Sequence, residues 1–401
     1  MMNYLISAYS VNPYKGSEDS IGWNWVLQYE KNYKEGDRII LLTKKFNEKD
    51  TRRGLKEYNI QHVELVIVDV PNALNWFREK HSAFHHMYYI LWQHWAWLWV
   101  KHSGIHFDVI HHVTMNDYRI PSELYKAKGA KVIWGPMGGA QVTPRPLKGY
   151  EKNQLVASFR EFVNKSCSWN PFYKKALRSY YKIYCINNET QEQISHIVGK
   201  DVPLMPELAL RDEYKNLPIQ ERKNEVLKIV FVGRLIGKKG IAFLVDALSL
   251  MPTDIAWELL IFGDGDDRAL IEKQIADSGI EKNVNLMGNR PLNQIAEAYQ
   301  QADVFVLPSL RETSGNVLLE AMAYAVPIVA FDTSFCKELS NKQCGIFVNV
   351  NQSLDKIKKD FCNAIIKLAE DKTLRGKIGR NGYEYANRLT WEDKYNKIIS
   401  K

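Results

Sequence analysis

The sequence predicts an α/β protein made of two doubly wound parallel sheets, and three observations support this. The 401 residues exceed what a single hydrophobic core usually holds, which indicates two domains. Short runs of Val, Ile and Leu without polar alternation recur along the chain, as in parallel strands that are buried on both faces. Segments with helical periodicity separate these runs, as the crossovers of βαβ units do.

Six strands are expected in each half of the chain. In the first half they cover residues 3–8, 38–43, 63–70, 107–112, 131–135 and 182–187. In the second half they cover residues 227–232, 257–262, 283–287, 304–307, 327–331 and 345–348. Open parallel sheets bind ligands outside the carboxyl ends of their strands. We therefore expect the two domains to face each other across a cleft that holds a ligand.

The predicted domains differ in charge. Residues 1–200 hold 27 Lys and Arg against 18 Asp and Glu, whereas the remaining residues hold 27 against 28. Between the halves, residues 201–223 contain three prolines and dense charge, which is typical of a linker. The basic first half is expected to meet an anionic partner, either an acidic membrane surface or a phosphorylated acceptor. Nucleic acid is not expected, because no helix-turn-helix, zinc-finger or RNP pattern occurs.

Composition excludes several other classes of protein. With 45% hydrophobic and 25% charged residues and no low-complexity tract, the chain is neither disordered nor fibrous. Its five cysteines are scattered without metal-binding spacing, which is typical of a reducing cytoplasm. The aromatic and apolar run at residues 87–100 is interrupted by polar residues and is too short to cross a bilayer. Residues 1–10 lack the features of a signal peptide, so a cytoplasmic protein is expected.

The loop after the seventh predicted strand is rich in glycine and positive charge. It reads Gly233-Arg234-Leu235-Ile236-Gly237-Lys238-Lys239-Gly240. Its glycines allow tight turning, and Arg234 and Lys239 can converge on one anion. The spacing matches neither a Walker A loop nor GxGxxG, so a solvated basic turn and a diphosphate site both remain open. The next strand ends in Gly263-Asp264-Gly265, whose acidic residue also suits a structural role at the following helix.

Residues 302–327 are the most informative stretch of the sequence. A strand ends at Pro308, a polar loop follows, and a helix is expected to begin near Ser314 to Asn316. Free backbone N–H groups of Gly315, Asn316 and Val317 would suit a phosphate. Glu312 precedes this helix and Glu320 lies within it, and each carboxylate can accept two sugar hydroxyl groups.

These motifs resemble those of the retaining glycosyltransferases of family 4, which have the GT-B fold of two Rossmann-like domains. The resemblance rests on Val232-Gly233-Arg234-Leu235 with Lys239-Gly240, on Gly263 and Gly265, and on Glu312 and Glu320 with their surroundings. The first half is similar to a subgroup found in bacterial surface-polysaccharide loci. That similarity rests on Ala8-Tyr9-Ser10, Lys15-Gly16-Ser17-Glu18, Gly22-Trp23-Asn24-Trp25, His111-His112-Val113-Thr114, Arg119-x-Pro121-Ser122, Trp134-Gly135-Pro136-Met137-Gly138-Gly139 and Thr390-Trp391-Glu392.

The resemblance implies a role for each matching residue. Arg234 and Lys239 would hold the donor diphosphate, Glu312 the transferred sugar and Glu320 the nucleotide ribose. One of the adjacent residues His111 and His112 would meet the donor sugar, and His112 is the preferred candidate. The implied catalytic residues are Arg234, Lys239, Glu312 and His112. The implied donor-binding residues are Gly16, Gly233, Arg234, Lys239, Gly263, Asp264, Gly265, Met287, Arg290, Glu312, Ser314, Gly315, Asn316, Val317 and Glu320. The implied acceptor-binding residues are Lys15, Ser17, Glu18, His111, Arg119, Gly138 and Gly139.

The resemblance also implies domains, chemistry and partners. The first domain, residues 1–200, would bind the acceptor, and the second, residues 224–385, would bind a UDP, GDP or dTDP sugar. A C-terminal helix at residues 386–401 would pack back on the first domain. A hexose-type sugar would pass, with its anomeric configuration retained and without a metal, to a lipid-linked oligosaccharide in capsule, exopolysaccharide or O-antigen assembly. A soluble sugar or protein acceptor, and a catalytically silent sugar-nucleotide-binding relative, are the alternatives.

The aromatic stretch between Trp76 and Trp99 allows three interpretations. A helix that packs its aromatic residues on the sheet is the favoured one. Part of the stretch could instead lie in a membrane interface, where Trp and Tyr are common and nearby positive charge attracts anionic lipid. His81 and His85, four residues apart, could form half of a metal site, but no third ligand follows at a suitable spacing. No metal is therefore expected.

Overall fold

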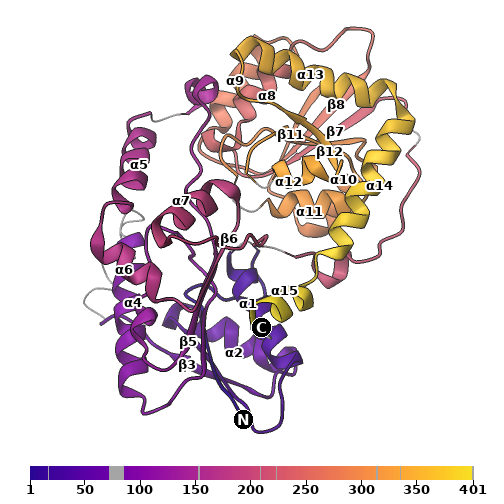
Figure 1. Cartoon of the computed structure of the whole chain (residues 1–401). Coiled ribbons are helices and arrows are strands. Elements are labelled where there is room, and N and C mark those ends of the chain that lie inside the picture. Colours follow the sequence, from indigo (N-terminus) through magenta and orange to yellow (C-terminus); the bar gives the residue numbers. More distant parts are fainter. Residues whose placement is uncertain are drawn as a thin grey trace. The chain divides into compact units, whose positions relative to one another are not determined.

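A computed structural model describes residues 1–16, 18–71, 85–151, 154–207, 209–222, 224–312, 315–334 and 336–399. The chain forms two compact units, each a parallel sheet covered by helices (Figure 1). The first unit contains Met1–Ala140, Val163–Leu208 and Trp391–Lys401, and the second contains Gln141–Phe162 and Ala209–Thr390. In the part of the chain that is described, no helix is long and apolar enough to cross a membrane.

The first unit alternates strands and helices from its start. Its strands are β1 (Asn3–Ser7), β2 (Arg38–Thr43), β3 (Val63–Ile67), β4 (Val109–His112), β5 (Lys131–Met137) and β6 (Lys182–Cys185). Its helices are α1 (Glu18–Lys31), α2 (Glu48–Glu57), α4 (His85–His102), α6 (Pro171–Ser179), α7 (Asn188–Val198) and α15 (Trp391–Ile399), with short 3-10 turns η1 (Lys45–Asn47) and η3 (Glu123–Lys126). Helix α5 (Gln154–Cys167) spans the boundary between the two units.

The second unit repeats this alternation. Its strands are β7 (Leu227–Val232), β8 (Trp257–Phe262), β9 (Val284–Gly288), β10 (Val304–Leu307), β11 (Ile328–Phe331) and β12 (Gly345–Val348). Its helices are α8 (Ile241–Leu248), α9 (Arg268–Asp277), α10 (Leu292–Gln301), α11 (Asn316–Ala323), α12 (Cys336–Asn341), α13 (Leu354–Glu370) and α14 (Lys372–Arg388). Three 3-10 turns complete it, namely η4 (Arg145–Tyr150), η5 (Asp212–Tyr214) and η6 (Gly237–Lys239).

Both sheets have the same strand order. The first runs β3-β2-β1-β4-β5-β6 and the second runs β12-β11-β10-β7-β8-β9, and the paired strands are parallel. This is the doubly wound Rossmann order, in which the direction of winding reverses between the first and fourth strands. The prediction of two such sheets is confirmed, and each of the twelve predicted strands overlaps an observed one. The reversal points, β1 with β4 and β7 with β10, are where ligands of such sheets bind.

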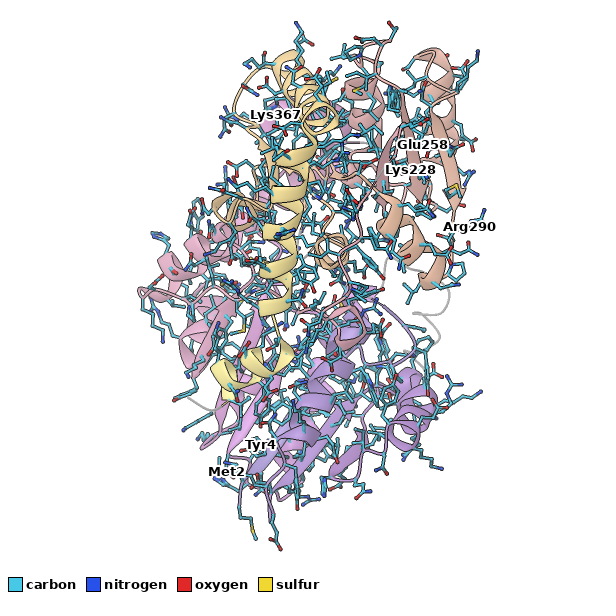
Figure 2. All side chains as sticks on the ribbon, turned by 90° about the vertical axis from the view of Figure 1, so that its right-hand side faces the viewer. Met2, Tyr4, Lys228, Glu258, Arg290 and Lys367 are labelled. Carbon is cyan, nitrogen blue, oxygen red and sulfur yellow. The ribbon has the colours of Figure 1, made fainter. Side chains whose placement is uncertain are left out.

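Burial explains why these apolar runs form central strands. All residues of β10 and β11 are buried, as expected for strands that are covered by helices on both faces. Polar residues lie nearer the strand starts, where Lys228 of β7 pairs in register with Glu258 of β8 at 3.8 Å (Figure 2). The sheet therefore forms the core of each unit, and the loops at the carboxyl ends of the strands carry the residues that can bind a ligand.

The aromatic stretch forms a core helix where it is described. Residues 76–84 lie outside the described residues, and α4 begins at His85. Tyr88, Tyr89 and Trp92 are buried, and the Trp92 indole donates to the Val68 carbonyl at 2.9 Å. The predicted helix that packs its aromatic residues on the sheet is thus confirmed for this part. Among the described residues, no group of His, Cys, Asp and Glu is placed to hold a metal ion.

The observed division of the chain differs from the predicted boundaries at residues 141–162. The prediction assigned all of residues 1–200 to the first domain, but this segment groups with the second unit. The reason is specific packing, since the Tyr150 ring contacts Phe243 at 5.7 Å and its hydroxyl donates to Asp246. Helix α15 groups with the first unit, where Trp391 packs against Trp25 at 5.7 Å between ring centroids.

Candidate functional site

The loops at the carboxyl edge of the second sheet are joined to one another by backbone hydrogen bonds. The Leu235 N–H donates to the Asp264 carbonyl at 3.0 Å, and the Gly263 N–H donates to Gly288 at 2.9 Å. The Leu310 N–H donates to the Lys238 carbonyl at 2.9 Å, across the reversal point between β7 and β10. The loops that follow β7, β8, β9 and β10 thus form one continuous backbone surface.

Two glycines make this close approach possible. Gly240 has a φ of 71°, and a Cβ there would lie 1.9 Å from the Pro308 carbonyl oxygen. Gly263 has a φ of 129°, and a Cβ there would lie 2.0 Å from the Gly233 carbonyl oxygen. Any other residue would clash and would also adopt a strained left-handed backbone. The glycines that the sequence analysis singled out therefore hold neighbouring loops together.

Lys239 and Glu312 form a buried ion pair at the reversal point. The Lys239 ammonium lies 2.7 Å from Oε2 of Glu312, and the Ser309 hydroxyl donates to the same oxygen at 2.9 Å. Burial opposes ionisation of Glu312, but the charge and hydrogen bond of Lys239 and the Ser309 hydroxyl outweigh it and hold the pKa of Glu312 below its usual value. Two residues predicted for the donor site are thus brought into contact, and Glu312 is charged.

The remaining cations of this loop are exposed. Arg234 and Lys238 extend beside Lys239. Partial desolvation of the Lys238 ammonium group is the largest cause that lowers the pKa of Lys238, and repulsion from Lys239 and Arg234 adds to it. Arg234 makes no ion pair with another described residue. Asp264, in the neighbouring loop, lies 3.6 Å from Arg268 and caps the Gly265 N–H at 2.8 Å. The β7 loop therefore presents excess positive charge, which suits an anionic ligand.

Helix α11 begins beside this ion pair, and no side chain among the described residues caps it. Gly315, its N-cap residue, is left-handed with a φ of 64° and provides no side chain to satisfy the first N–H groups. The N–H groups of Asn316 and Val317 meet no acceptor among the described residues. An uncapped helix start is a suitable site for a phosphate group. Ser314, another predicted donor residue, lies outside the described residues.

Glu320 is separated from Glu312 and has its own partners. Its carboxylate lies 3.5 Å from Arg211 and accepts a hydrogen bond from the Tyr299 hydroxyl at 3.4 Å. Burial raises the pKa of Glu320, and the charge of Arg211 opposes that shift. The hydrogen bond from Tyr299 is long, which leaves the carboxylate able to accept a further hydroxyl group. Arg211 was not predicted as a site residue, because it lies in the predicted linker.

Two further predicted donor residues lie at the edge of the second sheet. The side chain of Arg290 is exposed and donates from Nε to the Met287 carbonyl at 2.8 Å (Figure 2). This contact joins the end of β9 to the turn that follows it. Among the described residues, no contact links Met287 or Arg290 to the Lys239–Glu312 ion pair.

The first unit collects several predicted acceptor residues at the carboxyl edge of its own sheet. Glu18 accepts a hydrogen bond from the Met115 N–H at 2.5 Å, and burial raises the pKa of Glu18. Arg119 donates to Asp117 at 2.7 Å, and the backbone of Gly138 bonds with residues 116 and 118 of the same loop. A Cβ at Gly139 would meet Asp117 at 3.1 Å. Lys15 and Gly16 are exposed beside this group, and Ser17 lies outside the described residues.

His111 and His112 are both fully buried at the end of β4. Nδ1 of His112 lies 3.0 Å from the Ser7 hydroxyl and Nε2 lies 2.8 Å from the Tyr89 hydroxyl. The ring of His111 lies 3.2 Å from the Gly135 carbonyl and 3.5 Å from the Tyr29 hydroxyl. Burial lowers the pKa of each histidine to about 3, so both rings are neutral. Contact of His112 with a donor sugar stays a prediction, and it requires one of these hydrogen bonds to open.

A segment that the sequence analysis did not assign to the site contacts the Glu312 loop. The Gln141 amide donates to the Glu312 carbonyl at 3.4 Å, and Glu151 pairs with Arg311 at 3.0 Å. The Glu151 side chain is 5% exposed and also accepts from the Thr143 hydroxyl. Nothing in the sequence shows which sheet residues 141–151 would contact.

Parts of this chain are similar in sequence to known proteins. Residues 213–385 match the family described as glycosyl transferases group 1. The amylovoran biosynthesis glycosyltransferase AmsK of Erwinia amylovora is 32% identical over 139 residues, which cover 33% of this chain and 34% of AmsK. The chain thus matches about a third of the length of that relative.

Solved structures show the same fold over the whole chain. WaaG, a glycosyltransferase involved in lipopolysaccharide biosynthesis, has a TM-score of 0.63 at 16% identity and covers 99% of this chain and 100% of its own. HepE of Anabaena in complex with UDP has a TM-score of 0.63 at 15% identity, with both chains covered fully. The chain therefore has the GT-B fold, and residues 213–385 of its second unit match the group 1 glycosyl transferases.

Proposed function

We propose that this protein is a retaining glycosyltransferase of family 4. It would move a hexose-type sugar from a nucleotide-diphosphate sugar to a lipid-linked oligosaccharide during assembly of a capsule, exopolysaccharide or O-antigen. The observation that carries the proposal is the Lys239–Glu312 ion pair, which stands between a cationic glycine loop and the uncapped start of α11. The names of AmsK and WaaG refer to surface polysaccharides, which supports the proposed pathway. The complex of HepE with UDP supports the proposed class of donor.

The proposed chemistry follows from the charges at this site. Cleavage of the donor leaves negative charge on the nucleotide diphosphate, which Arg234, Lys239 and the N–H groups at the start of α11 would stabilise. Glu312, kept ionised, would accept hydroxyl groups of the transferred sugar, and Glu320 would accept those of the ribose. In the front-face displacement that we propose, the departing phosphate oxygen takes the proton of the acceptor hydroxyl. The acceptor oxygen then bonds to the anomeric carbon on the face that the phosphate leaves.

We also propose that the reaction needs no metal, because Arg234, Lys239 and the start of α11 would supply the positive charge that the diphosphate needs. Turnover should be the same after EDTA treatment and dialysis as before it. Loss of turnover with EDTA, recovered on addition of Mg²⁺ or Mn²⁺, would overturn this part of the proposal.

We place the proposed membrane contact between α5 and α6 rather than in the aromatic stretch. Trp169 and Phe172 are 84% and 81% exposed, whereas the described aromatic residues at the start of α4 are buried. The exposed cations Lys165, Lys175 and Arg178 lie on the two flanking helices. Aromatic side chains beside positive charge suit the interface of an anionic membrane. Co-sedimentation with anionic vesicles should fall in W169S/F172S and not in Y58S, which replaces another exposed aromatic residue.

The donor is tested first by thermal unfolding with UDP, GDP and dTDP and their common sugars. A ligand at a hundred times its dissociation constant stabilises the native state by about 2.7 kcal/mol, which gives a readable shift. The nucleotide sugar that binds is then supplied with lipid-linked and soluble acceptors, and the anomeric configuration of the product is read by NMR. Transfer to a soluble acceptor alone would favour the alternative substrate. Folded protein that binds a nucleotide sugar and transfers nothing would favour a silent relative.

A further inference from the structure

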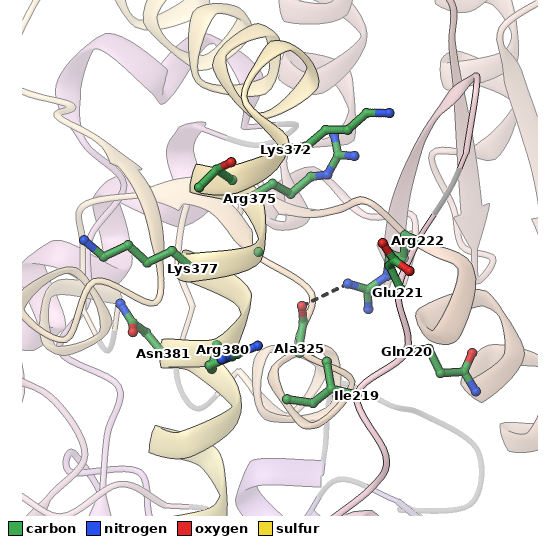
Figure 3. A pocket seen from close by; sticks show the side chains of 12 residues that line it. Ile219, Gln220, Glu221, Arg222, Ala325, Lys372, Arg375, Lys377, Arg380 and Asn381 are labelled. Atoms are coloured by element: carbon green, nitrogen blue, oxygen red, sulfur yellow. Dashed lines mark hydrogen bonds between the residues drawn. The ribbon is translucent and has the colours of Figure 1, made fainter.

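A second polar cavity lies at the opposite edge of the second sheet from the candidate site. Its volume is about 660 Å³, and it is lined by residues 219–222, Ala325 and the first half of α14 (Figure 3). Residue 222 comes just before β7 and Ala325 just before β11, so the cavity lies at the starts of the parallel strands. The Lys239–Glu312 pair follows strand ends, and a strand of six residues separates the two edges by about 20 Å.

Positive charge dominates the lining of this cavity. Its cations are Arg222, Lys372, Arg375, Lys377 and Arg380, and its single acid is Glu221. One of these cations already has a structural role, because Arg375 donates to the Leu368 carbonyl at 2.7 Å and pairs with buried Asp303 at 3.4 Å. The other cations leave the cavity with a clear excess of positive charge.

Arg222 is largely buried but has no carboxylate within ion-pair distance among the described residues. Its guanidinium donates to the Ala325 carbonyl at 3.1 Å and to the Tyr324 carbonyl, which fixes its position at the cavity wall. Its Nε is buried without a hydrogen-bond partner. Burial lowers the pKa of Arg222 to about 10, which shows the cost of its charge there. The charge of Asp303 opposes this shift, but Asp303 already pairs with Arg375 at 3.4 Å. The charge of Arg222 is therefore only partly compensated, and a further anion at this position would stabilise it.

The opposite wall provides further cations and open space. Lys372 and Arg380 are exposed and make no ion pair with another described residue. Figure 3 shows Arg380 on α14 extending toward Ala325, with Arg222 on the far side of that residue. Gly376 lies between Lys372 and Arg380 on α14, and a Cβ at this position would meet nothing within 4 Å. The cavity thus has room between two sets of cationic groups.

We propose that this cavity binds a phosphate-bearing anion through Arg222, Lys372 and Arg380. Guanidinium groups present forked donors that fit phosphate oxygens, and the volume is in the range of small-molecule sites. Among the lining side chains only those of Ile219 and Ala325 are apolar, so the ligand is polar throughout. The site is independent of the proposed transferase reaction, and the two can fail separately.

Binding of inorganic pyrophosphate, measured by calorimetry at low salt, tests this inference. The full-length protein is compared with K372Q/R380Q and with K273Q/K282Q, which removes two exposed cations elsewhere in the second unit. The K239A variant removes a cation of the candidate donor site. We expect the dissociation constant to rise at least tenfold in K372Q/R380Q, to stay within twofold in K273Q/K282Q, and a pyrophosphate site to remain in K239A.

Two results would overturn the inference. One is loss of all pyrophosphate binding in K239A with none lost in K372Q/R380Q, which would assign the anion to the donor site. The other is a folded wild-type protein that does not bind pyrophosphate and whose binding to vesicles, if any, does not depend on Lys372 and Arg380. Binding to phosphatidylglycerol vesicles distinguishes a phosphate on a lipid headgroup from a phosphate on a soluble ligand. Vesicle binding that needs Lys372 and Arg380 identifies a lipid headgroup, whereas pyrophosphate binding without vesicle binding identifies a soluble ligand.

Discussion

Lys239 and Glu312 are 73 positions apart in the sequence, yet the Lys239 ammonium lies 2.7 Å from the Glu312 carboxylate. The loops after β7 and β10 meet because these strands are neighbours at the point where the winding reverses. Burial alone would favour a neutral Glu312, and the ammonium group of Lys239 keeps it charged. The pair therefore preserves a carboxylate for sugar hydroxyl groups and a cation for the diphosphate.

Replacing Lys239 by Ala should lower turnover about a hundredfold, as removal of one preorganised charge does in other enzymes. It also leaves the buried Glu312 without its counter-charge, so the pKa of Glu312 should rise and the protein should be less stable. Steady-state kinetics with the donor found in the binding screen measures the first effect. K239R should recover part of the activity. The control K282A, which removes an exposed lysine elsewhere in the second unit, should keep the turnover of the wild type. Near-normal turnover of folded K239A would contradict the role of Lys239.

The buried histidines predict how stability depends on pH. Each ring is neutral in the folded chain down to about pH 3, whereas an unfolded histidine takes up a proton below about pH 6.5. Unfolding therefore binds protons between these values. The stability that each buried histidine contributes is complete above pH 6.5 and is lost as the pH falls, by up to about 1.4 kcal/mol per pH unit.

The free energy of unfolding should thus fall steeply from pH 7 to pH 5, and less steeply in H112Q. Urea unfolding at both pH values measures the two slopes, and comparison of slopes cancels any constant cost of the substitution. Equal slopes in the wild type and H112Q would show that His112 is not buried and neutral as described.

At the scale of elements, the site depends on loops that are held by backbone contact. Gly240 and Gly263 allow that contact, and the segment of residues 141–151 adds side-chain contacts to the loop that carries Glu312. The Glu151–Arg311 ion pair is well shielded from solvent, so it is expected to fix the loop more firmly than a surface pair would.

Replacing Gly240 by Ala should destabilise the protein by about 1–3 kcal/mol and weaken donor binding. The new Cβ would stand 1.9 Å from the Pro308 carbonyl, and the backbone would keep a left-handed conformation that costs Ala about 1–2 kcal/mol. Chemical denaturation and nucleotide titration measure the two effects. G376A is the matched control, because its helical position has open space and Ala should stabilise it by about 0.5–1 kcal/mol. A neutral G240A would contradict the tight loop contact.

At the scale of the whole molecule, the chain passes between the two units four times. The last crossing ends in α15, which packs on α1 of the first unit. Trp391 lies against Trp25, Tyr395 lies 5.2 Å from Tyr29, and Lys31 pairs with Glu392 at 2.6 Å. The buried Lys394 ammonium donates to the Glu207 carbonyl, and burial lowers the pKa of Lys394 to about 7. The C-terminal helix is therefore part of the core of the first unit.

Replacing Trp391 by Ala should reduce the free energy of unfolding by about 3–5 kcal/mol, since its ring is buried against Trp25 and would leave a cavity. Fluorescence-detected denaturation measures the change. W169A is the control, because an exposed indole contributes little to stability and its loss should cost less than about 0.5 kcal/mol. A similar, small effect of both substitutions would show that α15 is not integral to the core.

The sequence alone determined the strands and the loops that carry charge. Continuous apolar runs mark buried parallel strands, and Gly233 to Gly240 and Glu312 to Glu320 could be recognised because glycine, cations and carboxylates follow those runs directly. These are local patterns, set by the conformational freedom of glycine and by the exclusion of polar groups from a two-sided sheet.

Only the tertiary structure decided which of these residues meet. The contact of Lys239 with Glu312, the pairing of Arg211 with Glu320 and the attachment of residues 141–151 to the second unit all join segments far apart in the chain. The enclosure of both ring nitrogens of His112 also depends on Ser7 and on Tyr89 of α4. Such contacts follow from the packing of strands and helices in three dimensions, and no periodicity or spacing along the chain encodes them separately.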